Sequence, residues 1–260
     1  MYASVIATAR AVFAVQGIRF TLTGTDNVPR TGGALMVINH IGFFDFTYAG
    51  YAAKPNGRYV RFMAKAEVFA HPVAGPLMRG MHHIPVDRAA GAGAFDLAVD
   101  ALRAGEVVGV FPEATISSSF ELKAFKSGAA RMALQAGVPV LPMVIWGSQR
   151  VWTKRASKHL GRTKTPISVD IGAPVQPVGT ALELTNLVRE RMQQQLERVR
   201  RDYPGGHPAG APWVPASMGG GAPTPEEVLK LDRLDTRGRV AARRAKTDEP
   251  LRRKGSESPG

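Results

Sequence analysis

The sequence predicts a single α/β domain whose mixed, partly parallel sheet is flanked by helices. Short apolar segments that suit strands alternate with longer segments that suit helices between residues 19 and 202, and this alternation is typical of a sheet covered by helices. At 260 residues the chain can bury one sizeable core with extensions. We therefore expect one domain over residues 19–202, an N-terminal amphipathic helix over residues 1–18 and an irregular, largely disordered tail over residues 203–260.

Seven segments are predicted as strands because each is short, apolar and bounded by turn residues or helix-like segments. They are residues 19–22, 34–38, 59–64, 83–86, 107–111, 138–145 and 167–171. Residues 34–38 carry no polar side chain, which is expected of a strand that is buried on both faces.

Four segments are predicted as helices. Residues 43–53 contain no proline, residues 94–103 are followed by Gly105, and residues 128–136 are followed by Gly137. A glycine at this place is a common helix end. The fourth segment, residues 180–201, opens with Thr180 and Glu183 at the spacing of a capping box.

The two ends of the chain differ from the domain. Residues 3–15 are apolar with Arg10 in their middle and lack the basic start of a signal peptide. Two interpretations stay open: a helix lying in a membrane interface, or a helix packed on the protein's own core. Residues 204–225 are rich in Gly, Pro and Ala and are expected to lack regular structure. Residues 226–246 suit a charged helix.

The composition excludes several kinds of site. The chain has no cysteine, which excludes disulfides, zinc–thiolate sites and cysteine nucleophiles. His71, His82 and His83 match no standard metal-ligand spacing, so no metal is expected. No stretch of 18 or more apolar residues exists, so no conventional spanning helix is expected. The formal net charge of +13 indicates an anionic partner, which could be nucleic acid, an acidic lipid surface or a phosphorylated substrate.

A basic stretch over residues 150–164 contains no acid and lies beside Trp146 and Trp152. Its cations are Arg150, Lys154, Arg155, Lys158, Arg162 and Lys164. Cations with interleaved tryptophan suit an anionic membrane interface, and the same pattern could bind nucleic acid.

His40 and Asp45 lie five positions apart, directly after the apolar segment 34–38. Five residues along a regular α-helix rotate by about 500°, which would point the two side chains to different faces. They can meet only if His40 lies in the loop and Asp45 in the first turns of the next helix. A carboxylate on one imidazole nitrogen fixes the tautomer, which makes the other nitrogen a general base. The alternative is a histidine satisfied by a local carboxylate near a helix N-terminus.

Three further segments stand out at the ends of predicted strands or in the loops after them. They are residues 83–88, 110–117 and 138–143. Ligands in open α/β sheets collect at the carboxyl ends of strands, so a single active site would produce this pattern.

Taken together and in this order, these segments resemble the four sequence blocks of the glycerophospholipid acyltransferase family, the PlsC-like lysophosphatidate acyltransferases. The first block, H-x4-D, is matched by His40 and Asp45. The second, V/I-x-R, is matched by residues 86–88, and the third, F-P-E-G-T-R, by residues 111–115 with departures. The fourth, V-P-x-x-P, is matched by residues 138–142. The resemblance covers roughly residues 19–172.

The resemblance implies an O-acyltransferase that moves a fatty acyl group from an acyl thioester to the free hydroxyl of a lysophosphatidate-type acceptor, in phospholipid biosynthesis. His40 would take the hydroxyl proton in one step, and Asp45 would orient His40. No covalent enzyme intermediate is required, which agrees with a chain that has no cysteine and no G-x-S-x-G motif. The donor would be acyl-CoA or an acyl carrier protein, as a co-substrate, and no cofactor is expected.

Four more residues are candidates for substrate binding. Arg88 suits a phosphate headgroup because a guanidinium grips phosphate in a bidentate fork; the alternative is an ion pair with Asp87 or Glu113. Glu113 is expected to orient the acceptor glycerol or a cationic side chain, or to form a structural ion pair. Thr115 is expected to support its loop. Lys126 opens a helix, where an anion also benefits from backbone N–H groups.

Two departures from the third block leave the acceptor open. Ala114 replaces the usual glycine, which restricts the allowed shapes of the loop. Ile116 replaces the usual arginine and removes one phosphate contact. Lys123 or, as we expect, Lys126 could supply that charge. The acceptor could instead be another lipid alcohol or a glycolipid.

A further alternative is a non-catalytic protein that binds an anionic membrane or nucleic acid through its basic surface. The His40–Asp45 pair argues against it. We expect an enzyme at the cytoplasmic face of the cell membrane, in peripheral contact with anionic lipid, and we expect no nucleic acid partner.

Overall fold

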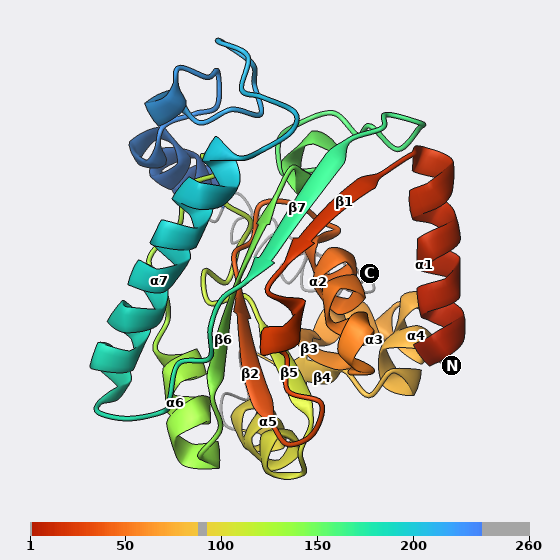
Figure 1. The fold of residues 1–260 in the computed structure, drawn as a ribbon, viewed down its shortest axis with the longest axis vertical. Coiled ribbons are helices and arrows are strands. Elements are labelled where there is room, and N and C mark those ends of the chain that lie inside the picture. The colour runs from red at the N-terminus through yellow and green to blue at the C-terminus, as the bar shows by residue number, and fades with distance from the viewer. Residues whose placement is uncertain (1, 88–92, 236–260) are drawn as a thin grey trace, which may run out of the picture.

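A seven-stranded mixed sheet forms the centre of the computed structural model, which describes residues 2–87 and 93–235 (Figure 1). The strand order is β1-β7-β6-β2-β5-β3-β4. The strands are β1 Arg19–Thr23, β2 Ala34–Ile38, β3 Val60–Lys65, β4 Ile84–Val86, β5 Val107–Val110, β6 Val140–Trp146 and β7 Pro166–Ile171. Neighbouring strands are parallel except for β6 and β7, which are antiparallel. The predicted mixed, partly parallel sheet is confirmed.

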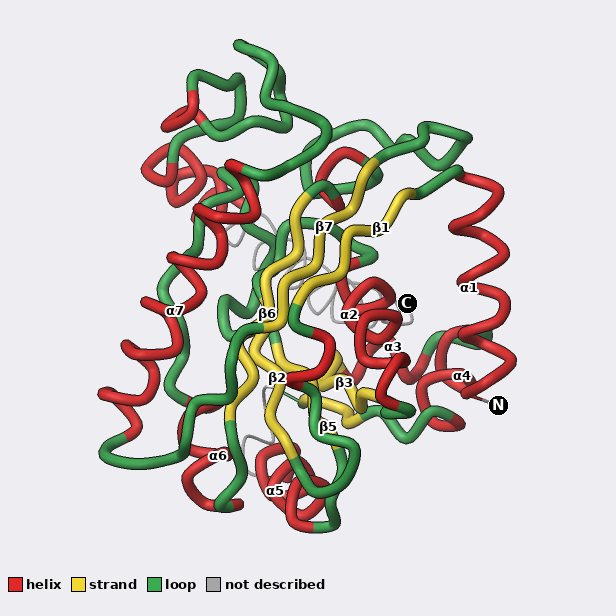
Figure 2. The backbone as a smooth tube through the Cα atoms, in the orientation of Figure 1, coloured by secondary structure: helices red, strands yellow, loops and turns green. Residues whose placement is uncertain are grey.

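Helices cover both faces of this sheet (Figure 2). One face is covered by α5 Gly93–Arg103, α6 Gly128–Ala136 and α7 Ala181–Arg201. The other is covered by α1 Tyr2–Gln16 and α2 Asp45–Ala53, with the short helices α3 Ala66–Ala70 and α4 Ala74–Gly80 on the same side. The capping box of α7 forms as predicted, because the Thr180 hydroxyl accepts from Glu183 N while the Glu183 carboxylate accepts from Thr180 N.

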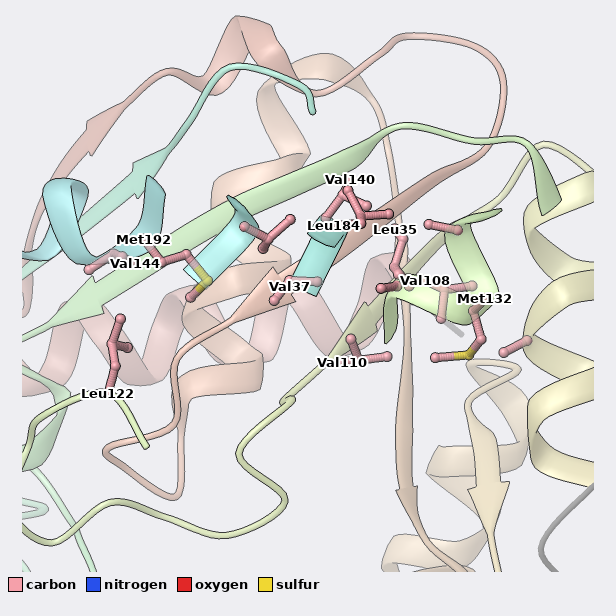
Figure 3. Packing of buried hydrophobic residues seen from close by; sticks show 14 of the residues in the cluster. Leu35, Val37, Val108, Val110, Leu122, Met132, Val140, Val144, Leu184 and Met192 are labelled. Atoms are coloured by element: carbon pink, nitrogen blue, oxygen red, sulfur yellow. The ribbon is translucent and has the colours of Figure 1, made fainter. Parts of the chain in front are cut away.

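Strand β2 shows how the two faces share one sheet, since all five of its residues are buried. Leu35 and Val37 face α5, α6 and α7 (Figure 3), whereas Met36 and Ile38 pack with α1 and α2. Successive side chains of a strand point to opposite faces. The unbroken apolar run of this segment therefore follows from its burial on both sides.

Helix α1 packs on the protein's own core along one edge. Phe13 is buried, and its ring lies 5.3 Å from those of Phe20 and Tyr48. The outward surface is also largely apolar, with Val12 and Val15 exposed. The helix is therefore apolar around most of its circumference rather than amphipathic as predicted. Its place in a membrane interface stays a prediction.

The chain from residue 203 to residue 224 is largely irregular, as predicted, apart from the 3-10 helix η4 Ala216–Met218. Residues 203–235, which were expected to be largely disordered, nevertheless make specific contacts with the domain. Tyr203 Oη donates to Pro166 O at 2.8 Å, and Trp146 Nε1 donates to His207 Nε2 at 3.2 Å. Val214 is fully buried. Aromatic anchors thus hold a Gly- and Pro-rich segment against the domain, where composition alone indicated none. Figure 1 shows this segment in blue, beside the end of α7.

Residues 225–235 form a helix within the segment 226–246 that was predicted as helical. The remainder of that prediction, and the predicted disorder near the C-terminus, lie outside the described residues. We call residues 225–235 the C-terminal helix.

Candidate active site

The loop after β2 is fixed to the sheet by Asn39. Its side-chain amide donates from Nδ2 to Ile145 O at 3.0 Å and accepts from Ile145 N at 2.7 Å. Because β2 runs parallel to both β5 and β6, the carboxyl ends of these three strands meet at one edge of the sheet. His40 follows directly at this edge.

Asp45, the first residue of α2, accepts four hydrogen bonds. His40 Nδ1 lies 3.0 Å from Asp45 Oδ2, and the same oxygen accepts from Ile41 N at 2.7 Å and Gly42 N at 2.8 Å. Asp45 Oδ1 accepts from Ser148 Oγ at 2.5 Å. The Asp45 side chain is fully buried. The loop position of His40 and the helical position of Asp45 are those that their spacing requires.

This contact fixes the chemical state of the imidazole that faces a substrate. A carboxylate only accepts, so Nδ1 carries the proton and Nε2 is left as an acceptor. The His40 side chain is 21% exposed, and its ring stacks on Phe111 at 4.3 Å between centroids. His40 is therefore oriented, shielded on one face and still reachable.

Gly42 is required for this geometry. A Cβ at this position would lie 2.8 Å from Ser148 Oγ and 3.1 Å from Asp45 Oδ1. Any side chain at this position would push the Ser148 hydroxyl and the Asp45 carboxylate apart.

The backbone N–H groups from His40 to Phe43 are all engaged. His40 N donates to Glu113 Oε1, and Phe43 N donates to Trp152 O. Ile41 N and Gly42 N are held by Asp45. These four N–H groups are therefore not available to the oxyanion that acyl transfer generates.

Glu113 ties two loops together from a buried position. Oε1 accepts from His40 N at 3.0 Å, and Oε2 accepts from Lys123 N at 3.2 Å. Burial raises the pKa of the Glu113 carboxyl to about 8, against the lowering effect of these two N–H groups. The sequence predicted an acceptor-orienting acid or a structural ion pair. The structure shows Glu113 holding two backbone N–H groups, and its predicted role toward the acceptor stays a prediction.

The remaining predicted binding residues are placed as follows. Thr115 Oγ1 accepts from Lys123 Nζ at 2.7 Å, so Thr115 holds a neighbouring cation. Lys126 lies just before α6 with an exposed side chain, and its N–H donates to Pro112 O. Arg88 lies outside the described residues; β4, which precedes it, is parallel to β3. The roles of Arg88 and Lys126 stay predictions.

The two departures in the third block have distinct structural consequences. Ala114 adopts φ +60°, the left-handed conformation that the usual glycine would take without strain. Ile116 is buried, with 7% of its surface exposed. Its side chain therefore belongs to the core of the loop and cannot replace an arginine at a phosphate.

Sequence reasoning missed Ser148 and Thr153. Ser148 contacts Asp45, and Thr153 Oγ1 donates to Ile41 O at 2.6 Å. Both residues follow β6, and a polar residue directly after a buried parallel strand was a signal that could have found Ser148.

Two of the six cations in the basic stretch after β6 form ion pairs within the protein, and the predicted membrane role of the stretch stays a prediction. Lys154 and Arg155 pair with Asp232 and Asp235 of the C-terminal helix. Trp146 is fully buried and does not lie at an interface.

His83 has a structural role. It is buried, and its Nδ1 accepts from Phe62 N at 3.0 Å. Burial lowers the pKa of His83 to about 4, so the ring stays neutral as an acceptor.

Comparisons with known proteins show which proteins this chain is similar to. The acyltransferase family model matches residues 19–146. A 1-acyl-sn-glycerol-3-phosphate acyltransferase of Borreliella burgdorferi is 27% identical over 196 residues, covering 71% of this chain and 74% of the relative. The enzyme of the same name from Bacillus subtilis is 30% identical over 123 residues, covering 47% and 60%.

Coverage of the plant relatives is lower. A 1-acyl-sn-glycerol-3-phosphate acyltransferase of Limnanthes douglasii is 31% identical over 144 residues, and the chain spans 50% of its length. The crystal structure of PlsC from Thermotoga maritima matches with a TM-score of 0.62 and 24% identity, covering 75% of this chain and 77% of PlsC. This last likeness shows the fold. With the family model, the named relatives and the fold in agreement, the chain belongs to the PlsC-like acyltransferase family and is an acyltransferase.

Proposed function

We propose that the protein transfers a fatty acyl group from an acyl thioester, acyl-CoA or acyl carrier protein, to the free hydroxyl of a lysophosphatidate-type acceptor. The observation that carries this proposal is the His40–Asp45 pair, in which a buried carboxylate with four donors orients a reachable imidazole. The names of the relatives support the acceptor class.

The proposed reaction uses His40 as both base and acid. Nε2 takes the proton of the acceptor hydroxyl while the hydroxyl oxygen attacks the thioester carbonyl carbon. Asp45 stabilises the imidazolium that forms. When the tetrahedral intermediate collapses, the C–S bond breaks and the imidazolium returns the proton to the leaving thiolate. The ester and the free thiol are the products, and no bond to the enzyme forms.

The direct experiment is mass spectrometry of products from a mixed set of acyl donors and acceptors. We expect phosphatidate from lysophosphatidate and an acyl-CoA or acyl carrier protein. If no ester forms from any pair, the proposal is wrong, and vesicle flotation compared with nucleic-acid retention at a stated salt concentration then tests a binding role.

A second acceptor class is favoured by one observation. Ile116 is buried where the family's third block has an arginine, so one phosphate contact is missing. A non-phosphorylated lipid alcohol or a glycolipid would need no such contact. In the same product assay, this alternative predicts a higher kcat/KM for the non-phosphorylated acceptor than for lysophosphatidate.

We also propose peripheral contact with an anionic membrane, through the surface formed by α1, α2, α3 and α4. No helix within residues 2–87 and 93–235 is long and apolar enough to cross a membrane. Large apolar side chains are nevertheless exposed on these four helices and the loops that lead into them. They are Val12, Val15, Phe43, Phe46, Val68, Val73 and Leu77. Figure 1 shows the four helices on one side of the sheet.

Exposed positions allow a clean test, because their substitution leaves the core intact. Val73→Asp with Leu77→Asp should abolish co-sedimentation with vesicles that contain anionic lipid. Leu182→Asp, at an exposed position of α7 on the opposite side of the sheet, is the matched control. Equal sedimentation of both variants would place the contact elsewhere. The expected location of the protein at the cytoplasmic face of the cell membrane stays a prediction.

A further inference from the structure

Three cations converge on two carboxylates of the C-terminal helix. Asp232 Oδ2 accepts from Lys123 Nζ at 2.9 Å, and Asp232 Oδ1 accepts from Lys154 Nζ at 2.6 Å and from Arg155 Nη2 at 3.1 Å. Asp235 lies 2.5 Å from the same guanidinium and 3.0 Å from Lys154 Nζ. The three cationic side chains are 20–25% exposed. We call Lys123, Lys154 and Arg155 the cation cluster.

The cation cluster is built on the loops that hold the His40–Asp45 pair. Lys123 donates its backbone N–H to Glu113, whose other oxygen accepts from His40 N. On the other side, Lys154 and Arg155 directly follow Thr153, whose hydroxyl donates to Ile41 O. The cation cluster is therefore connected to the loop that carries His40 in two ways, through Glu113 and through Thr153.

The chemistry of the cluster matches a phosphate group. Three positive side chains face two carboxylates, which leaves a formal excess of one positive charge among these five groups. Cations gathered at partly buried positions repel one another unless an anion lies between them. Lys123 is also held toward this point by Thr115, next to the buried Ile116 that removes the family's arginine. A phosphate would satisfy the same donors as the two carboxylates.

The C-terminal helix is held in a way that permits release. Its first turn is fixed by the buried Val228 and by Thr224. The Thr224 hydroxyl accepts from Glu227 N, and the Glu227 carboxylate accepts from Thr224 N. Further along, Leu229 and Leu234 are exposed, at 54% and 61%. The last turns carry ion pairs at partly exposed positions, and such pairs are individually weak and sensitive to competing ions.

We propose that the cation cluster is a binding site for a phosphate monoester of a substrate, and that Asp232 and Asp235 occupy it in the free enzyme as a displaceable latch. The proposal rests on the proposed function for the identity of the ligand as a substrate. The anion could belong to the acceptor headgroup or to the phosphates of a CoA donor.

The test measures anion binding by the full chain, separately from acyl transfer. Isothermal titration calorimetry with glycerol 3-phosphate represents the acceptor, and adenosine 3′,5′-bisphosphate represents the donor. Asp232→Asn with Asp235→Asn should tighten binding of one probe by about tenfold, because a latch that closes most of the time lowers the apparent affinity by the open fraction. Lys154→Gln with Arg155→Gln should abolish that binding.

Matched controls use exposed charges on the same helix, Glu226→Gln for the acids and Lys230→Gln for the cations. These should leave affinity unchanged. In the wild type, the binding probe should also accelerate tryptic cleavage after Lys230 or Arg233, since it releases the helix. The probe that responds identifies the source of the phosphate.

The proposal is overturned if the affinity for each probe stays within about twofold of the wild-type value both in Asp232→Asn with Asp235→Asn and in Lys154→Gln with Arg155→Gln. The cluster would then be only a clamp for the C-terminal helix. Because anion binding and acyl transfer are read separately, an enzyme that transfers acyl groups without this response contradicts the latch alone. Anion binding that responds as expected in a protein with no transferase activity contradicts only the proposed function.

Discussion

Asp45 and Asp232 are both surrounded by donors, yet the two sites differ in what holds them. Asp45 is fully buried, and two of its four partners are backbone N–H groups of its own loop. Asp232 is 22% exposed, and three of its partners are long cationic side chains from distant loops. The first arrangement is rigid and suits a fixed orienting group. The second can be exchanged for another anion.

The pKa of Asp232 reflects this difference. Burial alone would raise the pKa of the Asp232 carboxyl, but hydrogen bonds from Lys154, Lys123 and Arg155 outweigh it and hold that pKa well below its usual range. Acid groups with a depressed pKa stabilise the fold above their unfolded pKa, and that stability is lost as the pH falls through the folded pKa. The C-terminal helix should therefore stay attached at neutral pH and respond to anions.

The largest expected difference between the two aspartates is catalytic. Asp45→Asn removes the charge that stabilises the imidazolium, and we expect kcat to fall by about 10³- to 10⁴-fold. Asp232→Asn should not lower kcat. Steady-state kinetics of both variants on one substrate pair checks this, and a similar loss in the two variants would erase the distinction.

A smaller effect is expected when only one donor to Asp45 is removed. Ser148→Ala deletes the hydroxyl on Oδ1 and leaves that side of a buried carboxylate without its hydrogen bond, which costs about 1–3 kcal/mol. We expect kcat to fall by roughly tenfold. Ser217→Ala, at an exposed residue that contacts Glu121, is the control. An unchanged kcat in Ser148→Ala would mean that the backbone donors suffice.

Glu113 can be tested through the pH dependence of stability rather than through the rate of acyl transfer. Its pKa is raised to about 8 in the folded chain, chiefly by burial. Its stabilising contribution is therefore complete below the unfolded pKa, near about 4.3, and is lost as the pH rises toward 8. Glu113→Gln cannot titrate and can accept only one of the two N–H groups. The wild type should thus exceed this variant in free energy of unfolding at pH 5, and the gap should narrow by pH 8. Urea unfolding at both pH values measures it, and a constant gap contradicts the assignment.

The smallest effect concerns strain in the loop that carries Glu113. Ala114 adopts φ +60°, a conformation that costs a residue with a Cβ about 1–2 kcal/mol. Ala114→Gly should raise the free energy of unfolding by up to about 1 kcal/mol, since glycine also loses more backbone entropy. Thermal unfolding measures this, and destabilisation would show that the Ala114 methyl makes contacts worth more than the strain.

Much of the fold could be predicted from the sequence because its strands are short apolar runs. Every predicted strand is present, and its ends shift by no more than two residues. Helices α3 and α4 were missed, since Pro72 and Pro76 interrupt that segment. The packing of residues 203–235 was also missed. It depends on Tyr203 and Trp213 meeting residues far away in the chain, which composition does not reveal.

The candidate site divides in the same way. His40 and Asp45 are local in sequence, so their spacing alone indicated their contact. Ser148 lies 103 residues from Asp45, and Asp232 lies 109 residues from Lys123. Strand order and tertiary packing bring such partners together. A single sequence does not show which distant residues will meet. Glu113 was found by its motif, but its partners are backbone groups that a side-chain pattern cannot name.

The most direct test of the account is the turnover of His40→Ala. The substitution removes the proposed base and leaves Asp45 with three of its four donors, so the fold should survive, as circular dichroism and thermal unfolding can establish. With lysophosphatidate and acyl-CoA, we expect kcat to fall by at least about 10³-fold. If the variant keeps more than about 3% of the wild-type kcat, the assignment of His40 as the general base is contradicted.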